Sequence, residues 1–175
     1  MIVKITLATA VIAALPMAAA SRCAPESPAG ASSAGPACSP SSKTRASLNL
    51  NKEQADNAVA VIRVAADMGL PERATVIAIA TTLQESDLDS SVVGDGGLAI
   101  GIFQQHPSWG RNRTDPAASA KRFYSRLVKV NRWQTRPLTE AAQAVQRSAY
   151  PNAYAKHETR AERIVAKLTT CTEAR

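Results

Sequence analysis

Glu85 is the residue of this sequence whose position best suits acid–base chemistry. Counted back from it in helical steps, the same helix face carries only apolar or weakly polar residues: Thr82, Thr81, Ala78, Ile77 and Ala74. A carboxyl group in such surroundings is poorly solvated, which disfavours its charged form and raises its pKa. An acid that stays protonated near neutral pH can give its proton to a leaving oxygen, as cleavage of a glycosidic bond requires. The open alternative is a helix-terminal glutamate that points into solvent.

A second carboxylate would decide which glycosidase chemistry is possible. Inverting hydrolases hold two carboxyl groups about 6.5–9.5 Å apart, and retaining ones about 5–5.5 Å apart. Asp87 and Asp89 follow the predicted helix end and are expected to be solvated turn residues. Asp95 lies between two glycines and is the best placed to reach a cleft, although Asp-Gly is also a common turn sequence.

No metal or cofactor site is expected. The sequence has no Cys-x-x-Cys pair and no pair of histidines at ligand spacing, and His106 and His157 lack nearby ligand partners.

The elements that must position Glu85 are predicted to be helices around one glycine-rich loop. Asn51 and Gln54 form a capping-box pattern before a helix that runs up to Gly69. Pro71 suits the first turn of a second helix, over residues 74–86, which is apolar on nearly every side and is therefore predicted to be central and buried. Four glycines then mark a turning loop: Gly94, Gly96, Gly97 and Gly101.

Three further helices are predicted after the loop. Asp115 and Pro116 open the first, Thr139 opens one that runs to residue 149, and Pro151 begins the last. No alternating strand pattern of any length occurs. The predicted fold class is mainly α, with at most a small β loop.

The N-terminal residues are predicted to lie outside the fold. Residues 1–20 have a positive start, an apolar stretch and an Ala-Ala-Ala site, the layout of a secretory signal peptide; an uncleaved membrane anchor is the alternative. Residues 21–46 are rich in Ala, Ser and Pro and are predicted to be a disordered linker, which leaves residues 47–175 as the domain. Export permits disulfides, but Cys23, Cys38 and Cys171 are an odd number and their pairing stays open.

The chain is basic, with a formal charge of +7 and a pI of about 9.7. Much of the charge lies on or just after one predicted helix, where a solvated face is the default explanation: Lys121, Arg122, Arg126, Lys129, Arg132 and Arg136. Because these cations do not alternate with aromatic residues, nucleic acid is not an expected partner. Anionic wall polymers suit the charge.

Three segments together resemble the lysozyme-like superfamily of lytic transglycosylases and goose-type lysozymes. They are Leu-Gln-Glu-Ser at residues 83–86, Gly-Ile-Phe-Gln-Gln at residues 101–105, and Ala-Val-Gln-Arg-Ser-Ala-Tyr-Pro-Asn-Ala-Tyr at residues 144–154. The full run is most similar to secreted actinobacterial members, and the resemblance covers roughly residues 48–168. The chain departs from the family pattern at Ala99, where a serine is frequent.

The resemblance implies a secreted, wall-associated enzyme, expected to be a monomer, that cleaves the MurNAc–GlcNAc β-1,4 bond of peptidoglycan glycan strands. Glu85 would be the general acid, Ser86 would orient it, Gln104 and Phe103 would contact the sugar, and Tyr150 or Tyr154 would lie near the catalytic carboxyl group. Lytic transglycosylases need only one glutamate, since the muramoyl 6-hydroxyl attacks. A non-catalytic wall-binding domain of the same fold is the alternative function. Whether Trp109 and Trp133 stack on sugar or pack in the core stays open.

Overall fold

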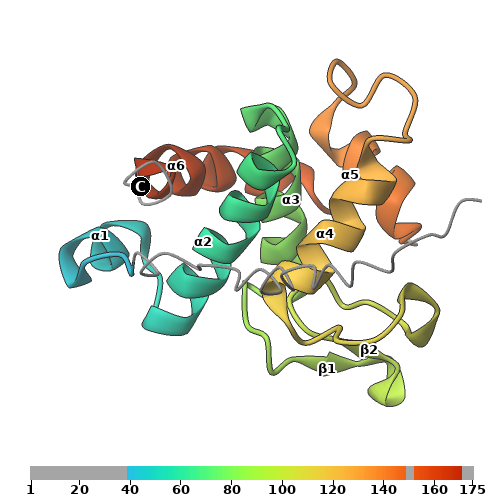
Figure 1. Cartoon of the computed structure of the whole chain (residues 1–175), viewed down its shortest axis with the longest axis horizontal. Coiled ribbons are helices and arrows are strands. Elements are labelled where there is room, and N and C mark those ends of the chain that lie inside the picture. The colour runs from blue at the N-terminus through green and yellow to red at the C-terminus, as the bar shows by residue number, and fades with distance from the viewer. Residues whose placement is uncertain (1–38, 149–151, 171–175) are drawn as a thin grey trace, which may run out of the picture. The chain divides into compact units, whose positions relative to one another are not determined.

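Helix α3 (Glu72–Glu85) runs through the middle of the domain and ends at the candidate acid. The computed structural model describes residues 39–148 and 152–170. In Figure 1, α3 is surrounded by the four helices that it contacts, which are α2 (Lys52–Asp67), α4 (Pro116–Leu127), α5 (Leu138–Gln146) and α6 (Glu158–Leu168). The described chain is therefore mainly α, as the sequence predicts.

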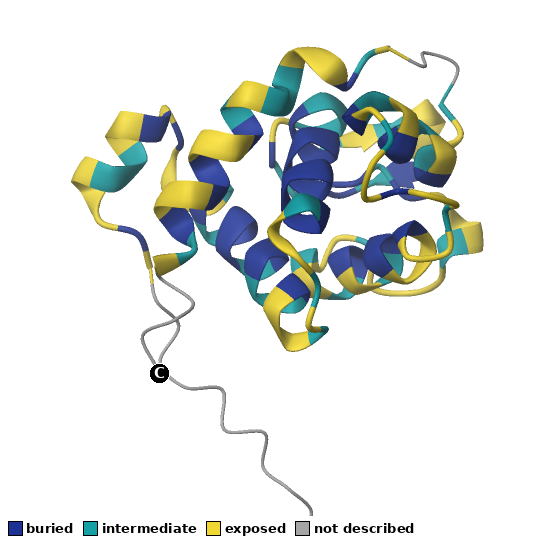
Figure 2. Ribbon diagram, turned by 90° about the horizontal axis from the view of Figure 1, so that it is seen from above, coloured by how far each residue is buried: buried dark blue, intermediate teal, exposed yellow. Residues whose placement is uncertain are grey.

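The predicted burial of the central helix is confirmed. Every residue from Ala74 to Leu83 is buried, and the buried residues in Figure 2 gather in the middle of the bundle while the outer helix faces are exposed. Thr81 and Thr82 are accommodated there because their hydroxyls donate to the carbonyls of Ile77 at 2.7 Å and Ile79 at 2.9 Å. A buried polar group that keeps a hydrogen bond costs little, so the helix can lie wholly in the core.

The predicted helix starts are confirmed by their caps. The side chain of Asn51 accepts from the backbone N–H of Gln54 at 2.8 Å, and the side chain of Gln54 accepts from the N–H of Asn51 at 2.9 Å. At α4, Asp115 Oδ1 accepts from the N–H of Ala118 at 2.6 Å, and Pro116 occupies the first turn. Both helices thus begin where local sequence satisfies their free N–H groups.

The glycine-rich loop forms a small hairpin below the bundle in Figure 1. Strand β1 (Val93–Gly94) pairs antiparallel with β2 (Ala99–Ile100), and the 3₁₀ turn Asp95–Gly97 joins them. Gly101 follows with φ of 75°, and a Cβ atom there would lie 2.4 Å from the carbonyl oxygen of Arg113. Only glycine fits such a backbone in so close an approach.

The ordered structure begins earlier than the predicted linker boundary at residue 46. Helix α1 (Ser42–Leu48) starts inside that segment, with the hydroxyl of Ser41 accepting from the N–H of Thr44 at 3.1 Å. Arg45 also donates to the carbonyl of Pro40 at 2.6 Å. The prediction of disorder, which rested on the low hydrophobicity of this segment, is wrong for its last residues. A local cap and the burial of Leu48 order a stretch that is otherwise polar.

The last two predicted helices have different ends. Helix α5 stops at Gln146 because Arg147 takes a left-handed conformation with φ of 57°, three residues before the predicted end. Helix α6 begins at Glu158 after the 3₁₀ turn Ala155–His157, so the predicted start at Pro151 is wrong. Tyr154 and the apolar face of α6 are buried in the core: Tyr154, Ala161, Ile164, Val165 and Leu168.

Some predictions concern residues outside the described ranges. These are the signal peptide at residues 1–20, the linker up to residue 38, the three cysteines and Tyr150. Among the described helices, none is long and apolar enough to cross a membrane.

Candidate functional site

Glu85 lines a cleft of about 340 Å³ at the end of α3. Three segments meet there: the C-terminus of α3, the chain from β2 to the 3₁₀ turn Pro107–Trp109, and the C-terminal end of α5. Its described lining is largely polar and consists of Glu85, Ala99, Gln104, His106, Trp109, Gln146, Arg147 and Ser148. The cleft thus collects residues from both sides of the glycine-rich loop around one carboxyl group.

The carboxyl group of Glu85 is held by two side chains from the C-terminal part of the chain. Tyr154 donates its hydroxyl to Glu85 Oε1 at 2.8 Å, and the amide of Gln146 lies close enough to the carboxyl group to lower its pKa. Burial raises the pKa of Glu85 above its usual range, and these two polar groups offset part of that rise. Glu85 therefore stays protonated to a higher pH than an exposed glutamate, as the sequence predicts from its apolar helix face.

Tyr154 is suited to remain a donor. Burial and the adjacent negative charge of Glu85 both raise the pKa of its phenol, so the hydroxyl keeps its proton throughout the physiological range. The side chain is fully buried. It therefore contacts the carboxyl group from the core side, and of the two tyrosines expected near Glu85 it is the one that the described residues place there.

Two hydrogen bonds join the segments that form the cleft. Gln146 Nε2 donates to the carbonyl of Phe103 at 2.9 Å, which connects α5 to the chain after β2. Ser86 Oγ donates to the carbonyl of Ile102 at 3.0 Å, which connects the end of α3 to the same chain. Ser86 thus positions the loop relative to α3, whereas the expected role was to orient Glu85.

Gln104 both lines the cleft and shapes its loop. Its backbone is left-handed, with φ of 45°, and its Nε2 donates to the carbonyls of Val92 and Gly101, each at 3.0 Å. Gly94 lies opposite it, and a Cβ atom at that position would lie 2.5 Å from Gln104 Oε1, so a larger residue there would displace the amide. The amide nitrogen is therefore engaged in holding the hairpin, while the side chain remains part of the cleft wall.

Phe103 does not contact the cleft, so its predicted role in binding sugar is wrong. Its side chain is fully buried and stacks on Phe123 with ring centroids 4.8 Å apart. The side chains of neighbouring residues point in different directions after the tight turn at Gly101, so Phe103 anchors the segment in the core while Gln104 faces the cleft. Trp133 is also buried, which resolves its open assignment in favour of core packing.

Asp95, the candidate second carboxylate, lies outside the cleft. Its side chain is 61% exposed and pairs with His106, with Nε2 and Oδ2 3.4 Å apart. His106 itself lines the cleft. Asp87 pairs with Arg160 at 2.7 Å, and Asp89 accepts from Ser91 in its own turn. Among the described residues that line the cleft, Glu85 is the only carboxylate.

For the glycan cleavage that the resemblance implies, the substitution Asp95→Asn is expected to leave turnover nearly unchanged. An exposed ion pair contributes about 0–1 kcal/mol, so the loss of the contact with His106 should change kcat/KM by less than about fivefold. Steady-state assays on solubilised glycan strands check this. A loss as large as that of a Glu85 variant would instead make Asp95 the second catalytic carboxylate.

Four residues that line the cleft had no role in the sequence analysis, or a role that it left open. They are Gln146, His106, Trp109 and Arg147. Gln146 lies in the segment that carries the resemblance, yet nothing local shows that its side chain reaches both Glu85 and Phe103. Trp109 is half-buried and carries the guanidinium of Arg126 over its ring, 3.4 Å from the centroid. The sequence offered one hint of this position: Trp109 follows Pro107 closely, and such a short turn keeps an aromatic side chain near the surface.

The substitution Tyr154→Phe is expected to move the basic limb of the pH–rate profile to higher pH. The hydroxyl stabilises the ionised carboxylate and so lowers the pKa of Glu85. Its removal raises that pKa further, and the acid remains protonated at higher pH.

Tyr124→Phe is the matched control for this substitution. Tyr124 is equally buried, and its hydroxyl donates to the carbonyl of Val61 at 3.2 Å, within the α2–α4 packing. Its loss should leave the profile in place. A shift with Tyr124→Phe, or none with Tyr154→Phe, would show that the hydroxyl of Tyr154 does not tune Glu85.

The chain matches no known protein-family model, and no curated protein sequence is significantly similar to it. The chemistry of the cleft therefore rests on its geometry. Among residues 39–148 and 152–170, no group of three or more His, Cys, Asp or Glu side chains is arranged to hold a metal ion.

Proposed function

We propose that the protein is a secreted, lysozyme-like glycosidase that cleaves the MurNAc–GlcNAc β-1,4 bond of peptidoglycan with Glu85 as its single catalytic carboxyl group. The observation that carries the proposal is the environment of Glu85. It is a half-buried acid with a raised pKa at the end of a central helix, and it lines a polar cleft between two other segments. The resemblance of residues 83–86, 101–105 and 144–154 to lysozyme-like enzymes supplies the substrate class.

In this mechanism the protonated Glu85 donates to the glycosidic oxygen as the C–O bond breaks. The carboxylate that results is stabilised by the hydroxyl of Tyr154, which donates to it, and by the nearby amide of Gln146. Glu85 then takes a proton from the attacking hydroxyl group and returns to its starting state. These two groups limit how far burial raises the pKa of Glu85, which helps the residue both to release a proton and to take one back.

The arrangement favours a lytic transglycosylase over a two-carboxylate hydrolase. Glu85 is the only carboxylate among the described lining residues, and Asp95 is engaged with His106. With no second carboxylate to act as nucleophile or to activate water, attack by the muramoyl 6-hydroxyl of the substrate itself is the simplest route. The product then carries a 1,6-anhydro end.

The test is digestion of purified sacculi by the mature protein, with Glu85→Gln as the inactive control and mass spectrometry of the released muropeptides. Anhydromuramoyl ends from the wild type and none from the variant are the expected result. Reducing ends would assign hydrolysis in place of transglycosylation. Equal solubilisation by both proteins would exclude Glu85 as the acid, and sedimentation with sacculi without any product would favour a non-catalytic wall-binding domain.

A further inference from the structure

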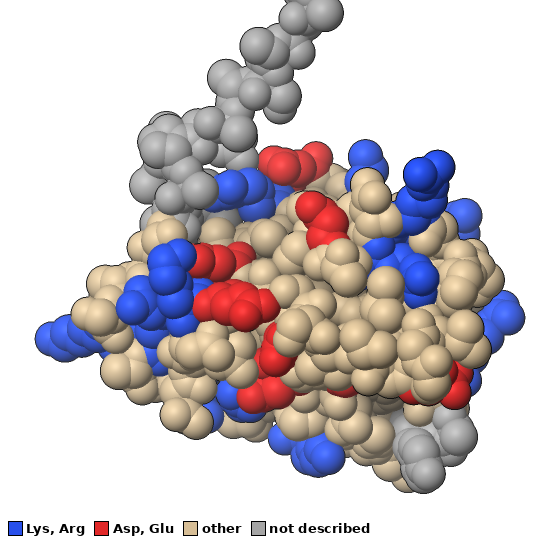
Figure 3. Space-filling model, turned by 90° about the horizontal axis from the view of Figure 1, so that it is seen from below, with Lys and Arg blue, Asp and Glu red and all other residues tan. Residues whose placement is uncertain are grey.

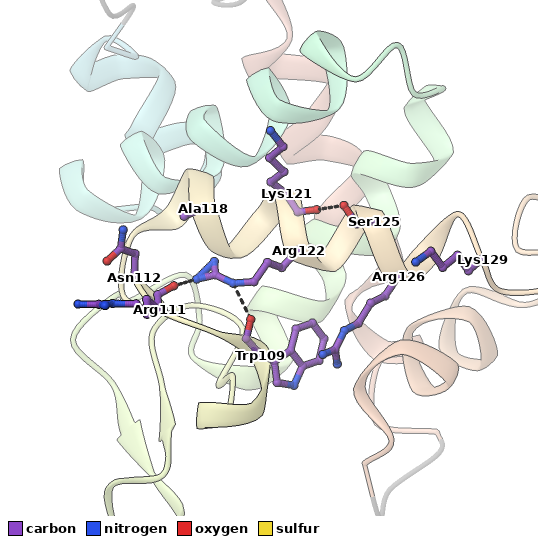
Figure 4. Close-up of a pocket in the computed structure, with 9 residues that line it drawn as sticks. All are labelled: Trp109, Arg111, Asn112, Ala118, Lys121, Arg122, Ser125, Arg126 and Lys129. Carbon is purple, nitrogen blue, oxygen red and sulfur yellow. Dashed lines mark hydrogen bonds between the residues drawn. The ribbon is translucent and has the colours of Figure 1, made fainter.

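A second, larger groove of about 570 Å³ lies along the outer side of α4. Figure 4 shows Arg122 and Arg126 reaching from the helix toward the segment that carries Trp109, with Arg111 and Lys129 near opposite ends of the groove. Five of its nine lining residues are cationic, and the full set is Trp109, Arg111, Asn112, Ala118, Lys121, Arg122, Ser125, Arg126 and Lys129. None of the nine is acidic, so the groove is a concentrated site of positive charge.

The cations of this groove lack acidic partners among the described residues. The ion pairs formed elsewhere, such as Lys52 with Asp56 and Arg73 with Glu158, do not include any of the five. On the face shown in Figure 3, by contrast, many Asp and Glu side chains lie beside Lys or Arg. Clustering five cations without compensation costs repulsion, and an anionic ligand would relieve it.

Two of the arginines build the groove, and the other cations are available to a ligand. Arg122 donates from Nε to the carbonyl of Trp109 at 2.9 Å and from its terminal nitrogen to the carbonyl of Arg111. Arg126 lies over the ring of Trp109. These contacts fix the chain that forms one wall, while the exposed side chains of Arg111, Lys121 and Lys129 carry charge to its surface.

Trp109 lines both this groove and the cleft of Glu85, so the two are neighbouring parts of one surface. A second observation agrees with this. Arg147 lines the cleft, and burial, together with the charge of Arg147, lowers the pKa of Arg126 in the groove. A ligand that occupies the groove therefore lies next to whatever occupies the cleft.

We propose that the α4 groove binds the carboxylate-bearing peptide that is attached to the muramoyl residue of the glycan in the cleft. The inference rests on the proposed function and names a further part of the substrate. The peptide stem leaves the glycan through the lactyl ether of muramic acid and bears free carboxylates, so it combines the required charge with the required proximity. A separate phosphodiester polymer has the charge, but it has no covalent reason to lie beside the cleft.

The test compares binding of two soluble glycan probes to protein that carries Glu85→Gln, which prevents turnover. One probe keeps its peptides, and the other has had them removed by an amidase. In this background, the triple substitution Arg111→Gln, Lys121→Gln and Lys129→Gln is measured by calorimetry. It should weaken binding of the peptide-bearing glycan by about tenfold, the order expected for three partly exposed ion pairs, and leave binding of the peptide-free glycan unchanged.

A matched triple substitution of exposed cations elsewhere separates the groove from net charge. Lys43, Arg163 and Lys167 lie on α1 and α6, and their change to Gln removes the same charge. The inference is overturned if this control weakens binding as strongly as the groove variant does. It is also overturned if the Glu85→Gln protein without further changes binds both glycans equally well. Competition by a phosphodiester wall polymer that removes the peptide effect would assign the groove to that polymer. If neither glycan binds, the proposed function fails, which is a different outcome from glycan binding that ignores the peptide.

Discussion

Replacing Glu85 with Gln is expected to reduce glycan cleavage by about 10²–10⁴-fold, the usual contribution of a general acid. The amide has the shape of the carboxyl group and can still accept from the hydroxyl of Tyr154, but it cannot release a proton to the glycosidic oxygen. The measurement is the initial rate of product release from solubilised glycan at the pH optimum. Glu162→Gln, at an exposed position of α6, is the matched control and should keep full activity.

The same variant is expected to be more stable than the wild type once the pH exceeds the pKa of Glu85. Burial raises the pKa of Glu85 in the folded protein above its value in the unfolded chain. Protonated Glu85 therefore contributes to the free energy of unfolding. This contribution is complete below the pKa that Glu85 has in the unfolded chain, and it is lost as the pH rises through the pKa that Glu85 has in the folded protein. The amide introduced by Glu85→Gln never ionises, so the Tm of the variant should overtake that of the wild type across this window.

Thermal unfolding at a series of pH values measures this effect. Loss of activity together with a Tm at neutral pH that is equal or higher would identify a chemical role for Glu85. An inactive variant whose Tm falls at every pH would instead show that the glutamate is needed for structure.

The substitution Gly101→Ala is expected to give the largest loss of stability of any single methyl addition in the loop. The left-handed backbone at φ of 75° costs about 1–2 kcal/mol for a residue with a side chain. The new Cβ atom would also lie 2.4 Å from the carbonyl oxygen of Arg113, and such overpacking costs about 1–3 kcal/mol. Because Gln104 donates to the carbonyl of Gly101, displacement of this residue should lower activity as well.

Gly96→Ala provides the control that separates backbone strain from the clash. Gly96 has a similar φ of 60°, but nothing lies within 4 Å of the position that a Cβ atom would take. Its free energy of unfolding should fall by only about 1–2 kcal/mol. Chemical denaturation of both variants measures the difference, and equal losses would contradict the proposed contact with Arg113.

The features that the sequence predicted correctly are those specified within one or two helical turns. The cap of Asn51 and Gln54, the start at Asp115 and Pro116, and the all-round apolar character of α3 are local patterns. The raised pKa of Glu85 follows from the same periodicity, because a carboxyl group at the end of a buried stripe must be partly buried. These patterns need no knowledge of which helices pack together.

The features that the sequence did not reveal depend on contacts between distant segments. Phe103 and Gln104 are adjacent, yet one is buried against Phe123 and the other lines the cleft, in a chain whose backbone is left-handed at both Gly101 and Gln104. The role of Gln146 depends on where the end of α5 meets the chain after β2. The cations of α4 were explained as a solvated face, since their spacing alone does not show that Trp109 returns to form a wall beside them.

The hydrogen bond between Glu85 and Tyr154 spans 69 residues of chain, and this has a consequence for the order in which the protein becomes competent. Synthesis proceeds from the N-terminus, so α3 and its acid are made well before α5 and the turn that carries Tyr154. Until these later segments dock, Glu85 lacks the hydroxyl of Tyr154, the amide of Gln146 and part of the burial that raises its pKa. A chain truncated before α5 is therefore expected to show none of the proposed glycan cleavage, because the site forms only when the C-terminal segments dock.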